Sequence, residues 1–214
     1  SIFGAKSSMV APDQALTGRE SPVLPHPAPH TVLGTSLIGP WPDGTESIYL
    51  AMGCFWGAEE IYWRLPGVAA TSVGYMGGFT PNPTYEEVCS GRTGQTETVM
   101  VAYDPAMLST YNVLKAFWEN HDPTQGYRQG NDVGTQYRSA IFTTTDAQAA
   151  LALQTRDAYA KVIAERGYPD ISTEIRPASD FPYFLAEDYH QQYLYKNPNG
   201  YRCHANTGLA LPPA

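Results

Sequence analysis

The stretch "SIYLAMGCFWGAEEIYWRLPG", residues 47–67, decides the fold, because its pattern changes from strand to helix within a few residues. The β-branched and aromatic residues of 47–52 predict a strand. Residues 55–64 predict a helix, which the sequence "LPG" ends. Cys54 stands at the junction of the two elements. A strand that leads directly into a helix indicates an α/β fold.

Alternating strand and helix signals continue beyond this stretch. Strands are predicted within 68–78, 95–105, 137–145 and 172–178. Helices are predicted for 109–122, capped by Ser109, for Asp146 to Arg166, capped by Asp146, and as one short helix after Glu187. We expect an α/β (α+β) fold, a two-layer sandwich with a mixed sheet and a ferredoxin-like core, because a barrel would need a longer run of βαβ repeats.

Composition and charge exclude several classes of protein. A chain of 214 residues with 43% hydrophobic and 12% aromatic residues can build a packed core, so it is not a disordered protein. The net charge of -8 argues against a nucleic-acid partner, which needs clustered Lys and Arg. No run of about 18 apolar residues occurs, so no membrane partner is expected. We expect a monomer in the cytoplasm.

Three cysteines, Cys54, Cys89 and Cys203, are too few and too widely spaced for a disulfide scaffold. No CxxC pair is present, which argues against a structural zinc site. The sequence "HPAPH", residues 26–30, holds two imidazoles, but its proline spacing fits a linker better than a metal site. The thiols are therefore predicted to be free or redox-active, and no metal is expected.

The composition divides the chain into three parts. Residues 1–45 are rich in proline and show no sustained periodicity, which predicts an extended arm that is either disordered or wrapped on the surface. Residues 46–195 carry the strand and helix signals and form the α/β domain. Residues 196–214 are rich in glycine, asparagine and proline, and we expect a flexible, loop-rich tail there.

Cys54 has the surroundings of a reactive thiol. It falls at the end of a strand and in the first turn of a helix, where unpaired backbone N–H groups and the helix dipole favour an anion, so we expect a thiol pKa below the usual value of about 8.5. Gly53 and Gly57 clear side chains from around the sulfur. A cysteine that only packs in the core is the alternative, and position alone does not separate the two. Cys89 lacks this context and is predicted to be a packing residue.

Phe55 and Trp56 follow the thiol where helix starts usually place polar residues. They can staple the helix onto the core. They can also build a small apolar pocket beside the nucleophile, whose faces suit a methyl or thioether group.

Glu97 shares one face of its predicted strand with Val99, Val101 and Tyr103. A carboxylate at the end of an apolar face loses water, which would raise its pKa and let it act as a general acid near neutral pH. An exposed glutamate at a strand end is the alternative. Further along the chain, the loop 129–139 is polar and contains glycine, and it offers Asp132 and Tyr137 as hydrogen-bonding groups. Arg138 can be another hydrogen-bonding group or, equally, a surface partner for an acidic residue.

Six segments, in this order, resemble the peptide methionine sulfoxide reductase A family. They are "GCFWG" (53–57), "GYMGGFTPNPTYEEVCSGRTGQTE" (74–97), "FWENHDPTQ" (117–125), "GNDVGTQYRSAIF" (130–142), "AEDYHQQYL" (186–194) and "NPNGYRC" (197–203). The resemblance covers residues 47–203, and the proline-rich arm resembles that of bacterial members. Agreement over six ordered segments favours the reactive thiol over the packing cysteine.

The resemblance implies an enzyme that reduces methionine S-sulfoxide, free or in proteins, without a metal or organic cofactor. Cys54 matches the attacking cysteine of the family, and Glu97 its acid. Phe55 and Trp56 match the pair that holds the substrate methyl group, while Tyr85, Asp132 and Tyr137 match the groups around the sulfoxide oxygen. Cys203 is expected to resolve a Cys54 sulfenic acid into a disulfide, which thioredoxin then reduces.

Two residues depart from the pattern of the family. Gln95 stands where members commonly have histidine, and Arg202 separates "GY" from the cysteine that often follows it directly. Two other functions remain as alternatives. One is a cysteine hydrolase that uses His121, His190 or His204 as the base, and the other is a non-catalytic module that binds methionine through the aromatic pair.

Overall fold

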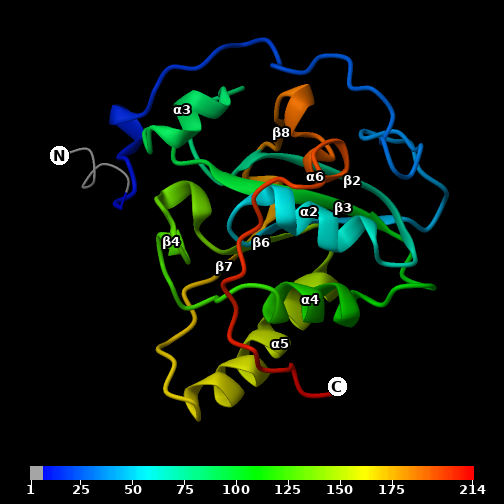
Figure 1. Cartoon of the computed structure of the whole chain (residues 1–214), viewed down its shortest axis with the longest axis vertical. Helices are drawn as coiled ribbons and strands as arrows, with labels where there is room; N and C mark the ends of the chain where they lie inside the picture. The colour runs from blue at the N-terminus through cyan, green and yellow to red at the C-terminus, as the bar shows by residue number, and fades with distance from the viewer. Residues whose placement is uncertain (1–6) are drawn as a thin grey trace.

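A six-stranded mixed sheet forms the centre of the computed structural model, which describes residues 7–214 (Figure 1). The strands are ordered β7-β6-β1-β3-β2-β8, and only β6 and β7 pair in parallel. The bounds are β1 Glu46–Ala51, β2 Val68–Met76, β3 Thr96–Tyr103, β6 Ala140–Thr143, β7 Glu174–Pro177 and β8 Phe184–Leu185. The strands β4 Arg128–Gln129 and β5 Asp132–Val133 form a separate small hairpin.

The four middle strands confirm the predicted ferredoxin-like core. Helix α2, Phe55–Trp63, connects β1 to β2, and helix α4, Thr110–Glu119, connects β3 to β6. Because β3 lies between β1 and β2 and is antiparallel to both, β1 and β2 run in the same direction. The chain therefore makes two split βαβ units that interlock in the order β6-β1-β3-β2.

The sheet has one face covered by helices. Helices α2, α4 and α5, Asp146–Ala164, contribute to one buried apolar cluster with the strands. On β3 that face carries Val99, Val101 and Tyr103, as the alternation predicted. Met100 and Ala102 point to the opposite face, where Trp41 and Tyr183 cover them. The two-layer arrangement is thus confirmed, with loops in place of helices on the second face.

Some boundaries differ from the prediction. The N-cap of α5 is Thr145, whose hydroxyl accepts a hydrogen bond from the Gln148 amide, so the prediction of Asp146 as the cap is wrong. Ser109 caps α4 as predicted. The sequence signals missed β8 and the β4–β5 hairpin, since two-residue strands are too short to show a period. Two further short helices are α3, Tyr85–Cys89, and α6, Tyr193–Lys196.

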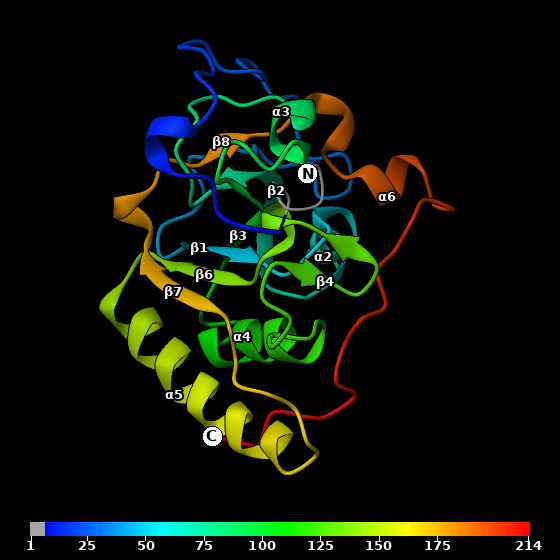
Figure 2. The ribbon, with the colours of Figure 1, turned by 90° about the vertical axis from the view of Figure 1, so that its left-hand side faces the viewer.

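The chain outside the core lies along the surface of the domain (Figures 1 and 2). In residues 7–45, the Leu16 amide donates to the Arg92 carbonyl at 2.9 Å, and Arg19 pairs with Glu87 at 2.8 Å. His30 is buried and hydrogen-bonded to Thr71 at 2.7 Å. The tail, residues 196–214, leaves α6 and runs past α2 to α4 and α5. No helix among residues 7–214 is long and apolar enough to cross a membrane.

Candidate functional site

Cys54 is the N-cap residue of α2, three residues after the end of β1. The backbone turns sharply here, with Gly53 at a φ of 96°, a conformation that favours glycine. A Cβ atom at position 53 would meet Gln129 Cγ at 2.8 Å, so a larger residue would displace that side chain. The turn leaves the half-buried thiol at the edge of the domain, between two cavities.

The first cavity, called here the reaction pocket, has a volume of about 280 Å³. It brings together seven of the eight site residues predicted from the sequence, and Tyr201 of the tail completes its wall. The lining residues are Cys54, Phe55, Trp56, Tyr85, Glu97, Asp132, Tyr137 and Tyr201. These residues come from five separate parts of the chain, which only the fold brings together.

Trp56 is held in place by two residues from the other end of the chain. Its indole N–H donates to His190 Nδ1 at 3.0 Å, and its ring stacks on Tyr193 with centroids 3.8 Å apart. The His190 ring is fully buried and also packs against Phe55, at 5.2 Å, and Tyr85, at 4.5 Å. Because His190 Nδ1 accepts this hydrogen bond, the ring is neutral, in agreement with burial lowering its pKa to about 4. Phe55 and Trp56 therefore form a rigid apolar wall of the reaction pocket.

Glu97 lies at the inner end of the reaction pocket and is 2% exposed. Its Oε1 accepts a hydrogen bond from the Phe55 amide at 3.1 Å. Burial raises the pKa of Glu97 to about 8, aided by the charge of Asp132 and opposed by the Phe55 amide. The carboxyl group holds its proton at neutral pH, as the sequence analysis predicted.

The raised pKa of Glu97 should be visible in protein stability. Between pH 4.5, the ordinary pKa of the side chain, and about pH 8, Glu97 keeps its proton in the folded protein but releases it in the unfolded chain. The free energy of unfolding therefore falls as pH rises through this window. Each pKa unit corresponds to about 1.4 kcal/mol. We expect Glu97→Gln to gain a few kcal/mol of stability relative to the original protein between pH 5 and pH 9, measured by urea unfolding.

Glu87 provides a control of opposite sign. The hydrogen bond from Arg19 lowers the pKa of Glu87, so its contribution is present above its ordinary pKa and is lost in acid. Glu87→Gln should therefore be less stable than the original protein at neutral pH, with a small difference because the pair is largely solvated. Parallel pH curves for the original protein and Glu97→Gln would contradict a buried, protonated Glu97.

The expected lowering of the Cys54 pKa is wrong for this state of the protein. Burial raises the pKa of the thiol well above its usual value, and the nearby Glu97 raises it further. A hydrogen bond with the backbone of Trp56 acts in the lowering direction, but this single contact does not offset the loss of water. The Cys54 thiol is therefore protonated at neutral pH.

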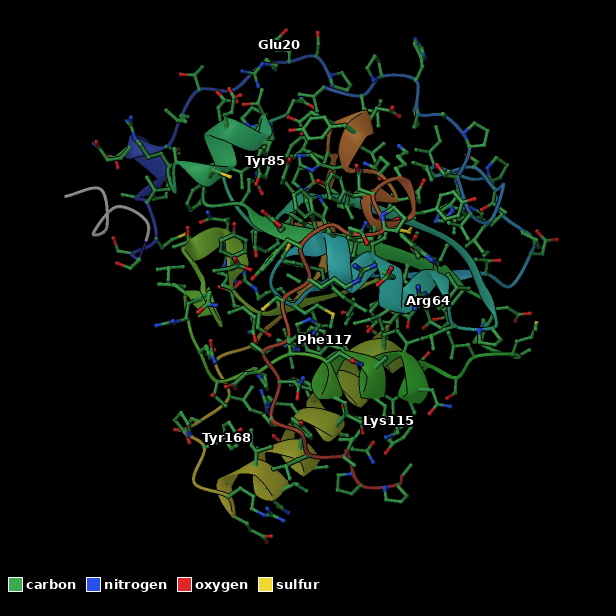
Figure 3. The ribbon with its side chains drawn as sticks, in the orientation of Figure 1. Glu20, Arg64, Tyr85, Lys115, Phe117 and Tyr168 are labelled. Carbon is green, nitrogen blue, oxygen red and sulfur yellow. The ribbon has the colours of Figure 1, made fainter. Side chains whose placement is uncertain are left out.

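Tyr85, Tyr137 and Asp132 supply the polar side of the reaction pocket. Burial raises the pKa of both tyrosines, so their hydroxyls keep their protons and can donate hydrogen bonds. Tyr85 begins α3 (Figure 3), and its amide donates to Glu187 Oε2 at 2.8 Å, which fixes this end of the helix. Asp132 accepts a hydrogen bond from the Tyr201 hydroxyl at 3.2 Å.

Arg138 lies behind Tyr137, and the prediction of a surface position for it is wrong. It is 2% exposed and donates to the carbonyls of Thr135 at 3.2 Å and Gly77 at 3.0 Å. It also pairs with Glu174 at 3.4 Å, so the predicted acidic partner exists. Arg138 thus ties the short turn that carries Tyr137 to the sheet.

Cys203 is the one predicted site residue outside the reaction pocket. It lines the second cavity, called here the tail cavity, which has a volume of about 180 Å³ and also touches Cys54. The Cys203 thiol donates to the Gln129 carbonyl at 3.7 Å. No disulfide joins Cys54 and Cys203 in this structure. Cys54 thus faces the aromatic pocket on one side and the second thiol on the other.

The comparisons with known proteins agree with this geometry. The sequence pattern of the peptide methionine sulfoxide reductase family matches residues 46–211. The chain belongs to this family. It is 59% identical to peptide methionine sulfoxide reductase MsrA of Salinispora arenicola, over 97% of this chain and 94% of that protein. It is 55% identical to peptide methionine sulfoxide reductase MsrA 1 of Synechocystis sp., over 99% of this chain and 94% of that protein.

Solved structures of family members have the same fold. Methionine sulfoxide reductase A of Corynebacterium diphtheriae superposes with a TM-score of 0.87 at 50% identity, covering 96% of this chain and all of that one. Mxr1 from Saccharomyces cerevisiae in reduced form gives a TM-score of 0.71 at 34% identity, covering 80% of this chain and 98% of that one. The predicted fold class is confirmed.

Sequence reasoning considered His190 only as the base of a hydrolase and did not single out Tyr193 or Tyr201. All three lie in segments that carried the resemblance. Their contacts are distant in sequence: His190 and Tyr193 contact Trp56 across 134 and 137 positions, and Tyr201 contacts Asp132 across 69 positions. Gln95, the first departure from the family pattern, bonds to the Gly78 amide and the Thr80 carbonyl, both at 2.9 Å, and so holds a loop beside the site.

Two of the three histidines considered as bases for a hydrolase have other partners. His121 bonds to the Phe117 carbonyl at 2.6 Å and to Ser139 at 2.8 Å, and burial lowers its pKa to about 4. His190 bonds to Trp56. His204 is exposed in the tail and lines the tail cavity, but it does not line the reaction pocket. The reaction pocket instead places the carboxyl groups of Glu97 and Asp132 beside Cys54, which does not favour acyl transfer.

Proposed function

We propose that the protein reduces methionine S-sulfoxide to methionine, free or within proteins, and thereby repairs oxidised proteins. The observation that carries this proposal is the reaction pocket, where the thiol of Cys54, the neutral acid of Glu97 and the aromatic pair line one cavity. Each group matches one requirement of the reaction: a nucleophile for sulfur, a proton for oxygen and an apolar surface for the methyl group. Family membership supports the same substrate class.

Phe55 and Trp56 position the substrate in this proposal. A methyl group on the aromatic wall leaves the sulfoxide sulfur toward Cys54, while the oxygen points to the hydroxyls of Tyr85 and Tyr137. Those neutral hydroxyls donate hydrogen bonds that stabilise negative charge on the oxygen as it develops. The aromatic wall, the Cys54 thiol and the tyrosine hydroxyls each receive a different substituent of the sulfur, so their fixed arrangement supports selection of one epimer. The resemblance to the family points to the S epimer.

The first half-reaction transfers oxygen from methionine sulfoxide to the thiol. Cys54 sulfur attacks the sulfoxide sulfur and an S–S bond forms, while Glu97 gives its proton to the oxygen, which otherwise would be too basic to leave the sulfoxide sulfur. The S–S bond then breaks as the hydroxyl group moves to the Cys54 sulfur, and methionine is released. The proton of the thiol passes to Glu97 and restores the acid. The net change is a thiol plus a sulfoxide giving a sulfenic acid plus methionine, so methionine sulfur gains two electrons and Cys54 loses two. The raised pKa of the Cys54 thiol fits proton release that is coupled to substrate binding.

The second half-reaction uses Cys203. Its sulfur attacks the sulfenic sulfur of Cys54, the S–S bond forms, and the hydroxyl leaves as water with the proton of the Cys203 thiol. The two cysteines line the same tail cavity, which supports this role for Cys203. An external dithiol of the thioredoxin type then reduces the disulfide by exchange. Because such reductants keep thiols reduced in the cytoplasm, we place the protein there.

Mass spectrometry of the enzyme without reductant tests this function. Incubation with the S epimer of methionine sulfoxide should yield one methionine per chain and a chain lighter by two hydrogens, as a Cys54–Cys203 disulfide requires. Cys203→Ser should also yield one methionine but stop at a Cys54 sulfenic acid, heavier by one oxygen. The R epimer should leave both proteins unchanged.

The same experiment separates the alternatives. A binding module would form no methionine and consume no thiols. Repeated turnover of Cys203→Ser with thioredoxin as the only reductant would show that another thiol resolves the sulfenic acid.

A further inference from the structure

Arg202, the residue that separates "GY" from Cys203, is bound to helix α2. Its Nε donates to Glu60 Oε1 at 2.9 Å and its Nη2 donates to Glu60 Oε2 at 2.8 Å. Two parallel bonds between a guanidinium and a carboxylate fix both the distance and the plane of the pair. Glu60 lies six residues after Cys54 and is only 9% exposed, so the pair joins the tail to the helix that presents the attacking thiol.

The guanidinium also organises the tail in front of Cys203. Its Nη1 donates to the Pro198 carbonyl at 2.8 Å and to the Gly200 carbonyl at 3.3 Å. The turn formed by residues 198–202 is thereby closed on the Arg202 side chain. These contacts make Arg202 the point at which the tail is attached to α2, directly before Cys203.

A second attachment lies further along the tail. The Tyr159 hydroxyl of α5 donates to the Leu209 carbonyl at 2.9 Å, and the Leu211 amide donates to Glu119 Oε2 of α4 at 2.7 Å. Leu211 is 3% exposed and belongs to the main core cluster. The tail is therefore a strap fixed near both ends, with Cys203 just beyond the first attachment.

The tail cavity lies beneath this strap. Its lining includes both cysteines, Arg202 and Glu60, together with Gly57 and Ile61 on the same face of α2. The strap packs closely on the adjoining Gly130, where a Cβ atom would lie 3.3 Å from Cys203 Sγ and 3.0 Å from the Ala205 side chain. The cavity thus adjoins Cys54, Cys203 and the ion pair of Arg202 with Glu60.

We propose that Arg202 is a positioning residue for the second half-reaction, and that its ion pair with Glu60 holds Cys203 at the tail cavity within reach of the Cys54 sulfenic acid. The proposal rests on the proposed function, since it presupposes that Cys203 resolves that acid. The ion pair acts as a tether: it keeps the local concentration of the Cys203 thiol high at Cys54, where a freely moving tail would dilute it. Arg202 takes no part in the attack on the substrate.

Rapid-quench kinetics without reductant, with one equivalent of methionine S-sulfoxide, tests the proposal. Two quantities are followed in each protein: methionine formed and disulfide formed. In Arg202→Met and Glu60→Gln the rate of methionine formation should stay within about twofold of the original protein, whereas disulfide formation should slow by about tenfold or more. Arg202→Lys, which keeps the charge but not the paired bonds, should slow disulfide formation less than Arg202→Met.

Arg64 provides a matched control for loss of a positive charge near Glu60. Its Nη2 lies 3.4 Å from Glu60 Oε2, but its side chain is 70% exposed and it does not belong to the tail (Figure 3). Arg64→Met should therefore form methionine and disulfide at the original rates. A slowing equal to that of Arg202→Met would overturn the proposal, because it would assign the effect to local charge.

The remaining outcomes are also decisive. Unchanged disulfide formation in Arg202→Met and Glu60→Gln would overturn the proposal and leave the proposed function intact. Equal slowing of both steps would overturn it as well, because it would indicate a general disturbance of the helix. Absence of methionine formation in the original protein would refute the proposed function and the proposal with it.

Discussion

Cys54→Ser is expected to abolish reduction of methionine sulfoxide, with a loss of roughly 10⁴-fold or more in rate. Serine keeps the size and the N-cap position, but its hydroxyl is a far weaker nucleophile toward sulfur and cannot be oxidised to an analogue of a sulfenic acid. The measurement is methionine release from a dabsyl-labelled sulfoxide with thioredoxin, thioredoxin reductase and NADPH. Binding of substrate should persist, because the aromatic wall is unchanged.

Cys89→Ser is the matched control for this variant. Cys89 ends α3, outside the lining of the reaction pocket and the tail cavity, and a serine at this position can keep the hydrogen bond with the Tyr85 side chain. Loss of the Cys89 thiol should therefore leave the rate within a few fold of the original. Sulfoxide turnover by Cys54→Ser at a rate comparable to that of Cys89→Ser would contradict the whole account of the site.

Glu97→Ala is expected to slow methionine formation by roughly 10²- to 10³-fold, because the leaving oxygen would lack a proton donor. Glu97→Gln should keep much more of the rate, within about tenfold of the original, since its amide can donate a hydrogen bond to the oxygen and can still accept the one from the Phe55 amide. Single-turnover measurements at pH 6, 7 and 8 isolate this step from disulfide formation.

The pH dependence of these proteins provides an internal check. With the pKa of Glu97 at about 8, the rate of methionine formation in the original protein should decline as pH rises through 8 and the acid loses its proton, whereas Glu97→Gln should lack this decline. Small and equal effects of Ala and Gln would reject Glu97 as a donor to the oxygen.

The corrected state of Cys54 changes how its reactivity is understood. A helix N-terminus alone suggests a thiolate that is ready before the substrate arrives, but the burial of Cys54 and its closeness to Glu97 keep the thiol protonated. A protonated thiol is less open to chance oxidation, because the thiolate is the reactive form. In the proposed reaction, activation would depend on the substrate, whose oxygen would accept the proton that Glu97 holds.

The alternation of strand β3 shows how far a local pattern can lead. The spacing of Glu97, Val99, Val101 and Tyr103 placed the carboxyl group on the apolar face of the sheet, and the structure confirms that placement and the raised pKa that follows from it. Period-two alternation is set by the geometry of one strand, so it can be predicted from adjacent residues. The order of strands and helices and the ferredoxin-like core follow from signals of the same local kind.

The amino-acid sequence by itself determined the α/β class, the helix start at Cys54, the face on which Glu97 lies and, through six ordered segments, the family. Only the tertiary structure decided that His190 and Tyr193 hold Trp56, that Tyr201 closes the reaction pocket, that burial outweighs the helix terminus at Cys54, and that Arg202 ties the tail to Glu60. The division has one physical reason. Periodicity and capping act between residues a few positions apart, whereas desolvation and the contacts between the ends of the chain exist only after the chain has folded.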